Sequence, residues 1–257
     1  MAKFWLAATA LSGALLTSGC VIVVADDEDG SKMLHTTRSA DGYIVLDRDG
    51  DYSRLSGDLN LRGRLGGDLS LVSGDVDIDN MNIGGDVSIA AGDVHFTGNV
   101  RGETSIAGGD VSFDGTAQDE LNLAAGDLDV RGRINGPASL AAGDMVLNAD
   151  FRDGVRASAG SLHLAGEVRG PVHLTSINEM RRNRDYDSSQ GRIVMDGRVH
   201  DGGEICAVSV VFERDARIDG PLVVYAQSEP EMRSGAQVSG LDYRPRNRRD
   251  CEDLIDD

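Results

Sequence analysis

Alternating apolar and polar residues recur at a fixed interval along this chain between residues 57 and 174. Each unit holds two short alternating stretches joined by a glycine turn, such as residues 87–90 and 94–96 on either side of Gly92. The turn glycines follow one another in steps of 17 residues, with a single step of 18, at Gly57, Gly74, Gly92, Gly109, Gly126, Gly143 and Gly160. A fixed period is the signature of a repeat architecture. The pattern therefore predicts a solenoid.

The apolar residues of successive units form columns. Strand residues two apart in sequence point to the same face. Each unit therefore supplies inward-facing apolar residues from both stretches and one later inward-facing residue, which we call the anchor. The anchor column contains Leu65, Ile83, Val100, Ala117, Ile134, Phe151 and Val168. A single coil cannot bury its inward face, whereas stacked coils share a continuous core. We therefore expect an all-β fold, a three-sided, single-stranded parallel β-helix (β-solenoid) with coils of 17–18 residues and about six to seven regular coils.

The remaining segments bound this repeat, which we place at residues 41–177. Residues 43–46 have the pattern of a capping strand before the first coil, and the 18-residue unit has its extra residue between Ile78 and Ile83. Residues 178–192 interrupt the period, which predicts an inserted loop because insertions in solenoids map to loops. Irregular closing coils are expected over 193–243, and 244–257 forms a charged C-terminal tail.

The N-terminal residues predict export. Residues 1–19 combine Lys3, an apolar run and small residues before Cys20, as a signal peptide does, and the run is too short to span a membrane. Residues 16–20 resemble a bacterial lipobox, which predicts a lipid on Cys20, with residues 20–40 as lipidated N-terminus and tether. Val21 resembles the outer-membrane case, so we expect a bacterial envelope protein with the outer membrane favoured. An ordinary secretory signal is the alternative.

Two further cysteines remain after export. Cys206 and Cys251 do not have a zinc-binding spacing, and exported proteins form disulfides. We expect the two to pair and to hold the tail near the last coils, a constraint worth roughly 4 kcal/mol in the chain-entropy account. Two separate buried thiols are the alternative, against which the polar sequence around Cys251 argues.

An acidic residue follows almost every turn glycine. This acidic turn ladder consists of Asp58, Asp75, Asp93, Asp110, Asp127 and Asp144, and Ser161 closes it. Aspartate accepts hydrogen bonds from nearby amides and glycine suits the positive φ of such turns, so turn capping is our leading interpretation. Carboxylates about 5 Å apart in adjacent coils repel by roughly 0.8 kcal/mol per pair in water. Amide hydrogen bonds, protonation of some carboxylates or bound cations would offset that repulsion.

Candidate catalytic groups do not gather in the predicted coils. His95 and His163 share an outward column but stand four coils apart, roughly 19 Å, and His173 belongs to another face. The outward serines have no base beside them; they are Ser70, Ser88, Ser105 and Ser139. We therefore predict no catalytic residue, no cofactor and no metal site.

Charge bears on the partners. A net charge of −18 disfavours nucleic acid, so we expect none as a partner. Two basic spots stand out, Arg181, Arg182 and Arg184 in the insertion and Arg244, Arg246, Arg248 and Arg249 in the tail. We interpret them as solvated loops, with anionic envelope polymers or an acidic neighbouring molecule as the alternative partners.

The Gly-Asp-Val repeats, with residues 216–225 and 235–243, resemble the polymer-forming cytoskeletal (bactofilin-type) β-helix repeat family over roughly residues 57–243. The resemblance implies a right-handed β-helix without enzymatic activity, of a kind that assembles end to end at bacterial membranes. The chain differs from the family in its export signal, its two late cysteines and its insertion at Asn178.

These features together predict a non-catalytic, envelope-associated lipoprotein that serves as a structural scaffold or assembly module. Its expected partners are the membrane, through the N-terminal lipid, and either further copies of itself or an envelope polymer. A surface ligand-binding or adhesin module is the alternative, and a polysaccharide-active β-helix enzyme is a weaker one.

Overall fold

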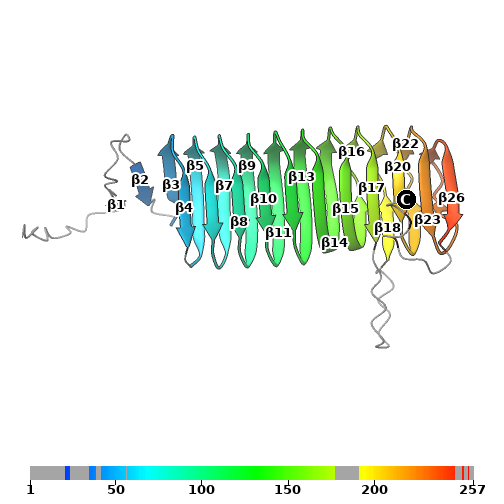
Figure 1. The fold of residues 1–257 in the computed structure, drawn as a ribbon, viewed down its shortest axis with the longest axis horizontal. Coiled ribbons are helices and arrows are strands. Elements are labelled where there is room, and N and C mark those ends of the chain that lie inside the picture. Colours follow the sequence, from blue (N-terminus) through cyan, green and yellow to red (C-terminus); the bar gives the residue numbers. More distant parts are fainter. Residues whose placement is uncertain are drawn as a thin grey trace, which may run out of the picture.

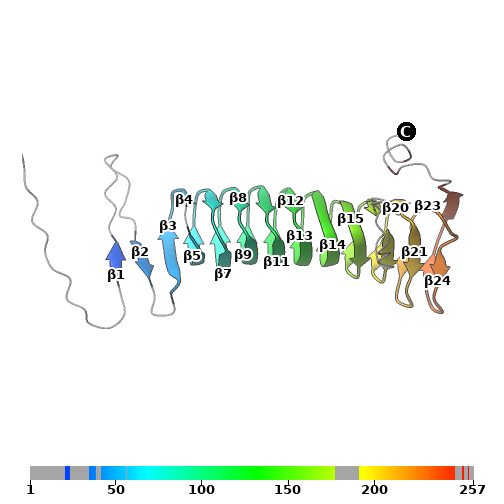
Figure 2. The ribbon, with the colours of Figure 1, turned by 90° about the horizontal axis from the view of Figure 1, so that it is seen from below.

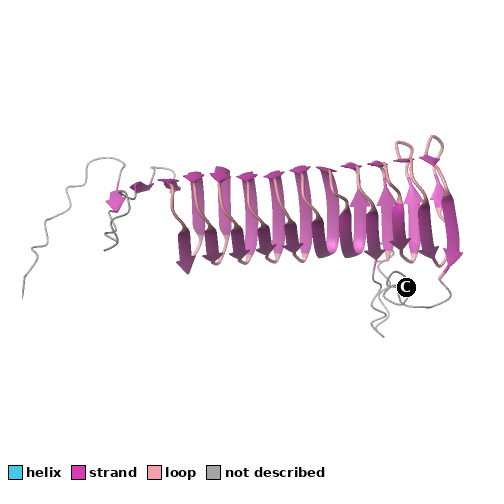
Figure 3. Ribbon diagram, turned by 45° about the horizontal axis from the view of Figure 1, so that its top comes forward, coloured by secondary structure: helices cyan, strands magenta, loops and turns pink. Residues whose placement is uncertain are grey.

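The computed structural model describes residues 21–23, 35–38, 42–55, 57–176 and 191–246, together with Cys251 and Leu254. Parallel strands stack into a β-solenoid of about 11 turns (Figure 1). Every secondary-structure element in the described residues is a strand (Figure 3). The predicted fold class is confirmed, and the coils extend well beyond the regular repeat.

Each coil contributes one strand to a first sheet face. These strands pair in parallel and in register, so that Val87 lies between Leu69 and Thr104. In order, the face contains β4 (Tyr52–Leu55), β6 (Leu69–Val72), β8 (Val87–Ala90), β10 (Thr104–Ala107), β12 (Leu121–Ala124), the first parts of β14 (Ala138–Phe151) and β15 (Val155–Leu164), β17 (Val172–Ser176), β20 (Gly203–Cys206), β23 (Leu222–Ala226) and β26 (Leu241–Pro245).

A second set of strands supplies the other inward groups of each coil. It contains β3 (Ile44–Arg48), β5 (Leu59–Leu65), β7 (Val76–Ile83), β9 (Asp93–Val100), β11 (Asp110–Ala117), β13 (Asp127–Ile134), the second parts of β14 and β15, β18 (Arg192–Met195), β21 (Ser209–Phe212) and β24 (Glu231–Met232), with the short anchor strands β16 (Glu167–Val168), β19 (Arg198–Val199), β22 (Arg217–Ile218) and β25 (Gln237–Val238). In β9, Val94, Phe96 and Val100 are buried. Gly98 lies between them with φ of 150°. A Cβ there would stand 2.1 Å from the carbonyl oxygen of Met81, so glycine permits this close stacking.

The predicted columns form one continuous core. The Phe96 and Phe113 rings stack with centroids 5.1 Å apart and an interplanar angle of 6°. Burial of each such side chain contributes about 1.5–3 kcal/mol relative to exposure. Thr104 and Ser176 are the fully buried hydroxyl residues among the described residues.

The 18-residue coil is accommodated by a local bulge. The register of β7 shifts between Ile78 and Met81, where the sequence predicts the extra residue. Asn80 has φ of 49° and is the one non-glycine residue of the described chain with positive φ. The Asn80 amide donates a hydrogen bond of 2.8 Å to Thr97 Oγ1 in the next coil. Asparagine tolerates this left-handed conformation better than most residues.

Antiparallel strands cover the edge of β3 at the N-terminal end of the solenoid, while β4 pairs only with β6 among the described strands. Strand β3 begins at Ile44, within the capping strand predicted at residues 43–46, and pairs in parallel with β5. On its other side β3 pairs antiparallel with β2 (His35–Arg38), which pairs antiparallel with β1 (Val21–Val23) (Figure 2). Residues 20–40, which the sequence indicates as lipidated N-terminus and tether, therefore contain two edge strands.

The C-terminal third continues the stack with longer coils. Residues 178–190 of the predicted insertion lie outside the described residues. Gly191 and Arg192 belong to a coil instead, because the Gly191 amide donates to the Gly160 carbonyl at 2.6 Å and Arg192 begins β18. The first-face strands advance by 19 residues, from 203 to 222 to 241. The predicted tail loses its first two residues to β26, which ends at Pro245.

The last coil leaves core positions open. Met232, Val238, Leu241 and Tyr243 continue buried columns by pairing with Phe212, Ile218, Leu222 and Val224. Yet Met232 is 45% exposed and the other three are only partly buried. In the described part of the chain no further coil covers them.

Candidate functional site: an acidic groove along the coils

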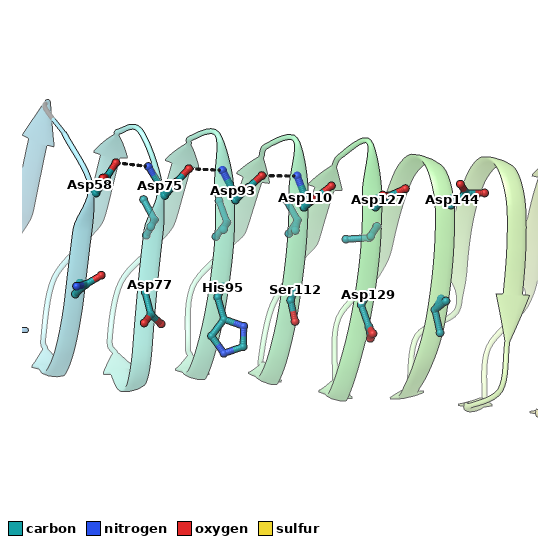
Figure 4. Close-up of a pocket in the computed structure, with 16 residues that line it drawn as sticks. Asp58, Asp75, Asp77, Asp93, His95, Asp110, Ser112, Asp127, Asp129 and Asp144 are labelled. Carbon is teal, nitrogen blue, oxygen red and sulfur yellow. Dashed lines mark hydrogen bonds between the residues drawn. The ribbon is translucent and has the colours of Figure 1, made fainter.

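The acidic turn ladder forms as predicted. Figure 4 shows the six aspartates in one row along the coils. In the first part of the row, the carboxylate Oδ1 of each aspartate accepts a hydrogen bond from the backbone N–H of the next aspartate. The distances are 3.1 Å from Asp75 N to Asp58, 3.1 Å from Asp93 N to Asp75 and 3.2 Å from Asp110 N to Asp93. Charge-assisted bonds of this kind offset the repulsion between adjacent carboxylates.

The ladder glycines serve close packing rather than positive φ. The prediction of positive φ holds for Gly57, at 48°, and is wrong for the other glycines of the row. A Cβ at Gly92 would lie 2.8 Å from Asp75 Oδ1 and 2.9 Å from the Gly74 carbonyl oxygen. The carboxylate of one coil therefore occupies the space that a side chain in the next would need.

The hydrogen bonding changes halfway along the row. The amides of Asp127 and Asp144 donate to the carbonyls of Gly109 and Gly126 instead, at 3.2 and 3.1 Å. Asp144 Oδ1 accepts from the Ser161 hydroxyl. Among the described residues, no hydrogen bond or ion pair engages the carboxylates of Asp110 and Asp127.

A groove of about 850 Å³ runs beside the ladder. The ladder aspartates form one wall, and its floor includes Val76, Val94, Val111 and Leu128. The opposite wall is the next outward column, which consists of Asn60, Asp77, His95, Ser112, Asp129 and Val146. Val146 is 41% exposed, an apolar residue at the C-terminal end of this otherwise polar column. The groove can accommodate an elongated, positively charged ligand that carries apolar groups.

A second carboxylate ladder lies at the other turn of the coils, and the sequence analysis missed it. Asp51 accepts the Asp68 amide, Asp68 accepts the Asp86 amide and Asp86 accepts the Glu103 amide, each at 2.9 Å. Its signal is an acidic residue directly before the first strand of each coil at the same spacing, such as Asp86 before Val87. The repetition of one device at both turns favours a structural role for the amide-accepting carboxylates.

The sulfurs of Cys206 and Cys251 lie at disulfide distance, 2.05 Å, as predicted. Cys251 and Leu254 pack with Cys206, Tyr225 and Val223 in a small apolar cluster apart from the main core. Cys206 and Tyr225 alternate with inward residues of β20 and β23, so this cluster lies on the outer surface. The bridge thus fixes Cys251 to the side of the last coils.

An ion-pair cluster around His200 links three coils. His200 Nε2 hydrogen-bonds Glu167 Oε1 at 2.7 Å, and its Nδ1 lies 3.7 Å from Asp219 Oδ2. Arg198 donates to Asp219 at 2.8 Å. The bond with His200 lowers the pKa of Glu167, and the bond from Arg198 lowers the pKa of Asp219. The sequence analysis did not identify this cluster, whose members flank the anchor residues Val168, Val199 and Ile218 of three successive coils.

The other candidate residues take the places that their columns predict. His95 and His163 lie on one outward column, and the serine row is outward-facing and exposed. His173 Nδ1 stands 3.8 Å from Glu204 on the first face. Over the described ranges, histidine, cysteine and carboxylate side chains form no group of three or more suited to a metal ion.

Cys20 lies outside the described residues. Within those residues, a helix with the length and apolar composition to cross a membrane is absent. No protein-family model, curated protein or solved structure matches this chain.

Proposed function

We propose that this chain is a non-catalytic, envelope-associated β-solenoid lipoprotein that serves as a structural scaffold or assembly module. One observation carries the proposal, the difference between the two ends of the rod. At the N-terminal end β3 continues into antiparallel strands, whereas the last described coil exposes Met232 and only partly buries Val238, Leu241 and Tyr243. Bare strand edges with apolar groups favour pairing with another chain.

Two further features support the envelope part of the proposal. The Cys206–Cys251 pair at bonding distance suits an oxidising compartment outside the cytoplasm. The lipobox-like residues before Cys20 supply an attachment at the N-terminal end. Eleven coils at strand spacing make a rod of roughly 50 Å, so an anchored chain would present its C-terminal end away from the membrane.

Fractionation tests the anchor. The wild-type chain should pellet with membranes and carry a lipid-modified N-terminal cysteine, because acyl chains partition into the bilayer. Cys20→Ser should move the protein to the soluble fraction. A wild-type chain that is soluble, with an unmodified N-terminus after processing, contradicts the lipoprotein proposal and leaves the secretory alternative.

Sedimentation and electron microscopy of the purified protein test the assembly role. We expect concentration-dependent association that Met232→Lys combined with Val238→Lys abolishes, because lysines block strand edges. The matched control is Val72→Lys, which replaces a residue 53% exposed on β6, a first-face strand paired on both sides. A monomeric wild-type chain, or equal loss of association in both variants, contradicts assembly through the last coil.

The acidic groove supports a second candidate, a surface ligand-binding module. The groove has charged walls and an apolar floor, and its volume of about 850 Å³ falls within the range of small-molecule binding sites. A purified chain that stays monomeric but retains a cationic ligand would favour this candidate over the scaffold.

A further inference from the structure

A second pocket lies on the outer surface of the first sheet face and shares no lining residue with the acidic groove. It has a volume of about 290 Å³, and outward residues of β14, β15 and β17 line it. These residues belong to two adjacent columns, Ser139, Arg156 and His173 in one and Ala141, Ser158 and Thr175 in the other. Although the protein has a net charge of −18, no acidic side chain of the described residues lines this pocket.

Arg156 brings to the pocket an exposed guanidinium that the fold does not pair. Its side chain forms no hydrogen bond or ion pair with any residue that the structure describes. Other arginines of these coils are paired, since Arg133 and Arg169 lie 3.5 and 3.4 Å from Asp150. A guanidinium presents a planar set of donors that matches the two oxygens of a carboxylate. Arg156 is therefore available to a carboxylate from outside the chain.

The other polar groups of the pocket are also unused by the fold. The hydroxyls of Ser139, Ser158 and Thr175 form no hydrogen bond within the described part of the chain. His173 Nδ1 is buried without a hydrogen bond, and the carboxylate of Glu204 is 3.8 Å from it. A hydroxyl donates one hydrogen bond and accepts two. These groups suit a ligand that itself carries hydroxyls.

The charges of the pocket favour a ligand with a single negative charge. Arg156 is the one permanent cation among the described lining residues, and Glu204 opposes the charge that a protonated His173 would add. The negative field of the whole protein disfavours more highly charged anions. The volume lies near the lower limit of small-molecule sites, about 300 Å³, so the pocket suits one sugar-sized unit. One carboxylate surrounded by hydroxyls is the chemistry of a sugar acid.

We propose that this pocket binds a carboxylate-bearing sugar, with Arg156 paired to the carboxylate and the hydroxyls of Ser139, Ser158 and Thr175 bonded to the sugar hydroxyls. The proposal goes beyond the scaffold role. It depends neither on the lipid anchor nor on association through the last coil, so its failure would leave both of these intact.

Ligand-detected NMR titration of the intact protein tests the carboxylate contact. Glucuronate or its epimer galacturonate should bind at least tenfold more tightly than glucose or galactose, which lack the carboxylate, and Arg156→Gln should weaken this binding about tenfold. The matched control is Arg101→Gln, which removes an exposed arginine outside the pocket and should bind as the wild type does. Failure of both sugar acids to bind, or equal losses in the two variants, overturns the proposal. Tighter binding of glucose 6-phosphate than of glucuronate does so as well, because the pocket would then be a phosphate site.

The hydroxyl contacts need a separate test. Ser158→Ala/Thr175→Val should weaken the sugar acid about tenfold, since two neutral hydrogen bonds are lost, and should leave acetate binding unchanged. The control Ser70→Ala/Ser88→Ala removes two outward hydroxyls of the same face outside the pocket and should have no effect. Wild-type protein that binds acetate as tightly as glucuronate overturns the proposal, because an isolated carboxylate would then be sufficient. A disaccharide of glucuronate and a neutral sugar distinguishes the source: binding tighter than that of the monomer assigns the pocket to a glycan unit, and weaker binding to a free sugar acid.

Discussion

Among the residues that the structure describes, Thr104 is the one inward position where a hydroxyl group without a partner interrupts an apolar column. Its side chain is fully buried and stacks between Val87 and Leu121. No hydrogen bond to Thr104 Oγ1 is formed within the described residues. A buried hydroxyl without a partner costs about 1–3 kcal/mol in proteins. Thr104→Val replaces the hydroxyl with a methyl of nearly the same shape, so we expect the free energy of unfolding to rise by about 1–2 kcal/mol.

Thermal and urea unfolding measure this change. For a chain of this size, a gain of 1–2 kcal/mol corresponds to a rise in Tm of about 2–8 °C. Amide exchange within β10 should slow as well, because each coil depends mainly on its neighbours.

Two variants serve as controls. Ser176 is equally buried, but its hydroxyl donates to the Gly160 carbonyl at 2.8 Å, so Ser176→Ala should destabilise by about 1 kcal/mol. Thr116 is partly exposed, and Thr116→Val should change stability by less than about 0.5 kcal/mol. A Thr104→Val variant no more stable than the wild type would refute the reasoning, because it would mean that the hydroxyl is satisfied in solution.

Three further outcomes are expected. Reduction of the Cys206–Cys251 disulfide, or Cys251→Ser, should lower the free energy of unfolding by about 2–4 kcal/mol. It should also increase binding of a hydrophobic dye, since Tyr225 loses its contact with Cys251 and Leu254. An unchanged Tm under reduction would contradict this. Gly132→Ala should lower the free energy of unfolding by more than about 2 kcal/mol, because Gly132 has φ of 102° and a Cβ there would lie 2.0 Å from the Gly115 carbonyl oxygen. A urea midpoint equal to that of the wild type would contradict this. The folded-state pKa values of Glu167 and Asp219 are lowered, so the stability that these groups contribute is present above their unfolded pKa values of about 4 and is lost as pH falls through the folded pKa values. The double variant Glu167→Gln/Asp219→Asn should therefore lose less stability than the wild type as the pH is lowered. Parallel stability–pH profiles of the two proteins would contradict this.

The coil geometry follows from the sequence because it depends on local alternation repeated at one interval. Period-2 patterning decides which residues face inward, and the 17-residue step brings like residues into register. The same arithmetic places the extra residue of the 18-residue coil, which is the bulge at Asn80. The acidic turn ladder could be predicted for this reason. The partners of its carboxylates could not, because the repeat does not specify that the amides of Asp127 and Asp144 donate to the carbonyls of Gly109 and Gly126 instead.

Contacts across the insertion and at the ends of the chain were decided by the tertiary structure. The contacts of His200 with Glu167 and Asp219 depend on side chains of three neighbouring coils, and the repeat does not specify them. The groove lies between the acidic turn ladder and the neighbouring outward column, and its shape depends on how their side chains pack, which the pattern of polar residues does not encode. Pairing of Cys206 with Cys251 was expected from the sequence, but the packing of Cys251 and Leu254 against Tyr225 was not. Repeated local pattern specifies a solenoid because each coil contacts only its neighbours, whereas its ends and its surface grooves have no repeat to specify them.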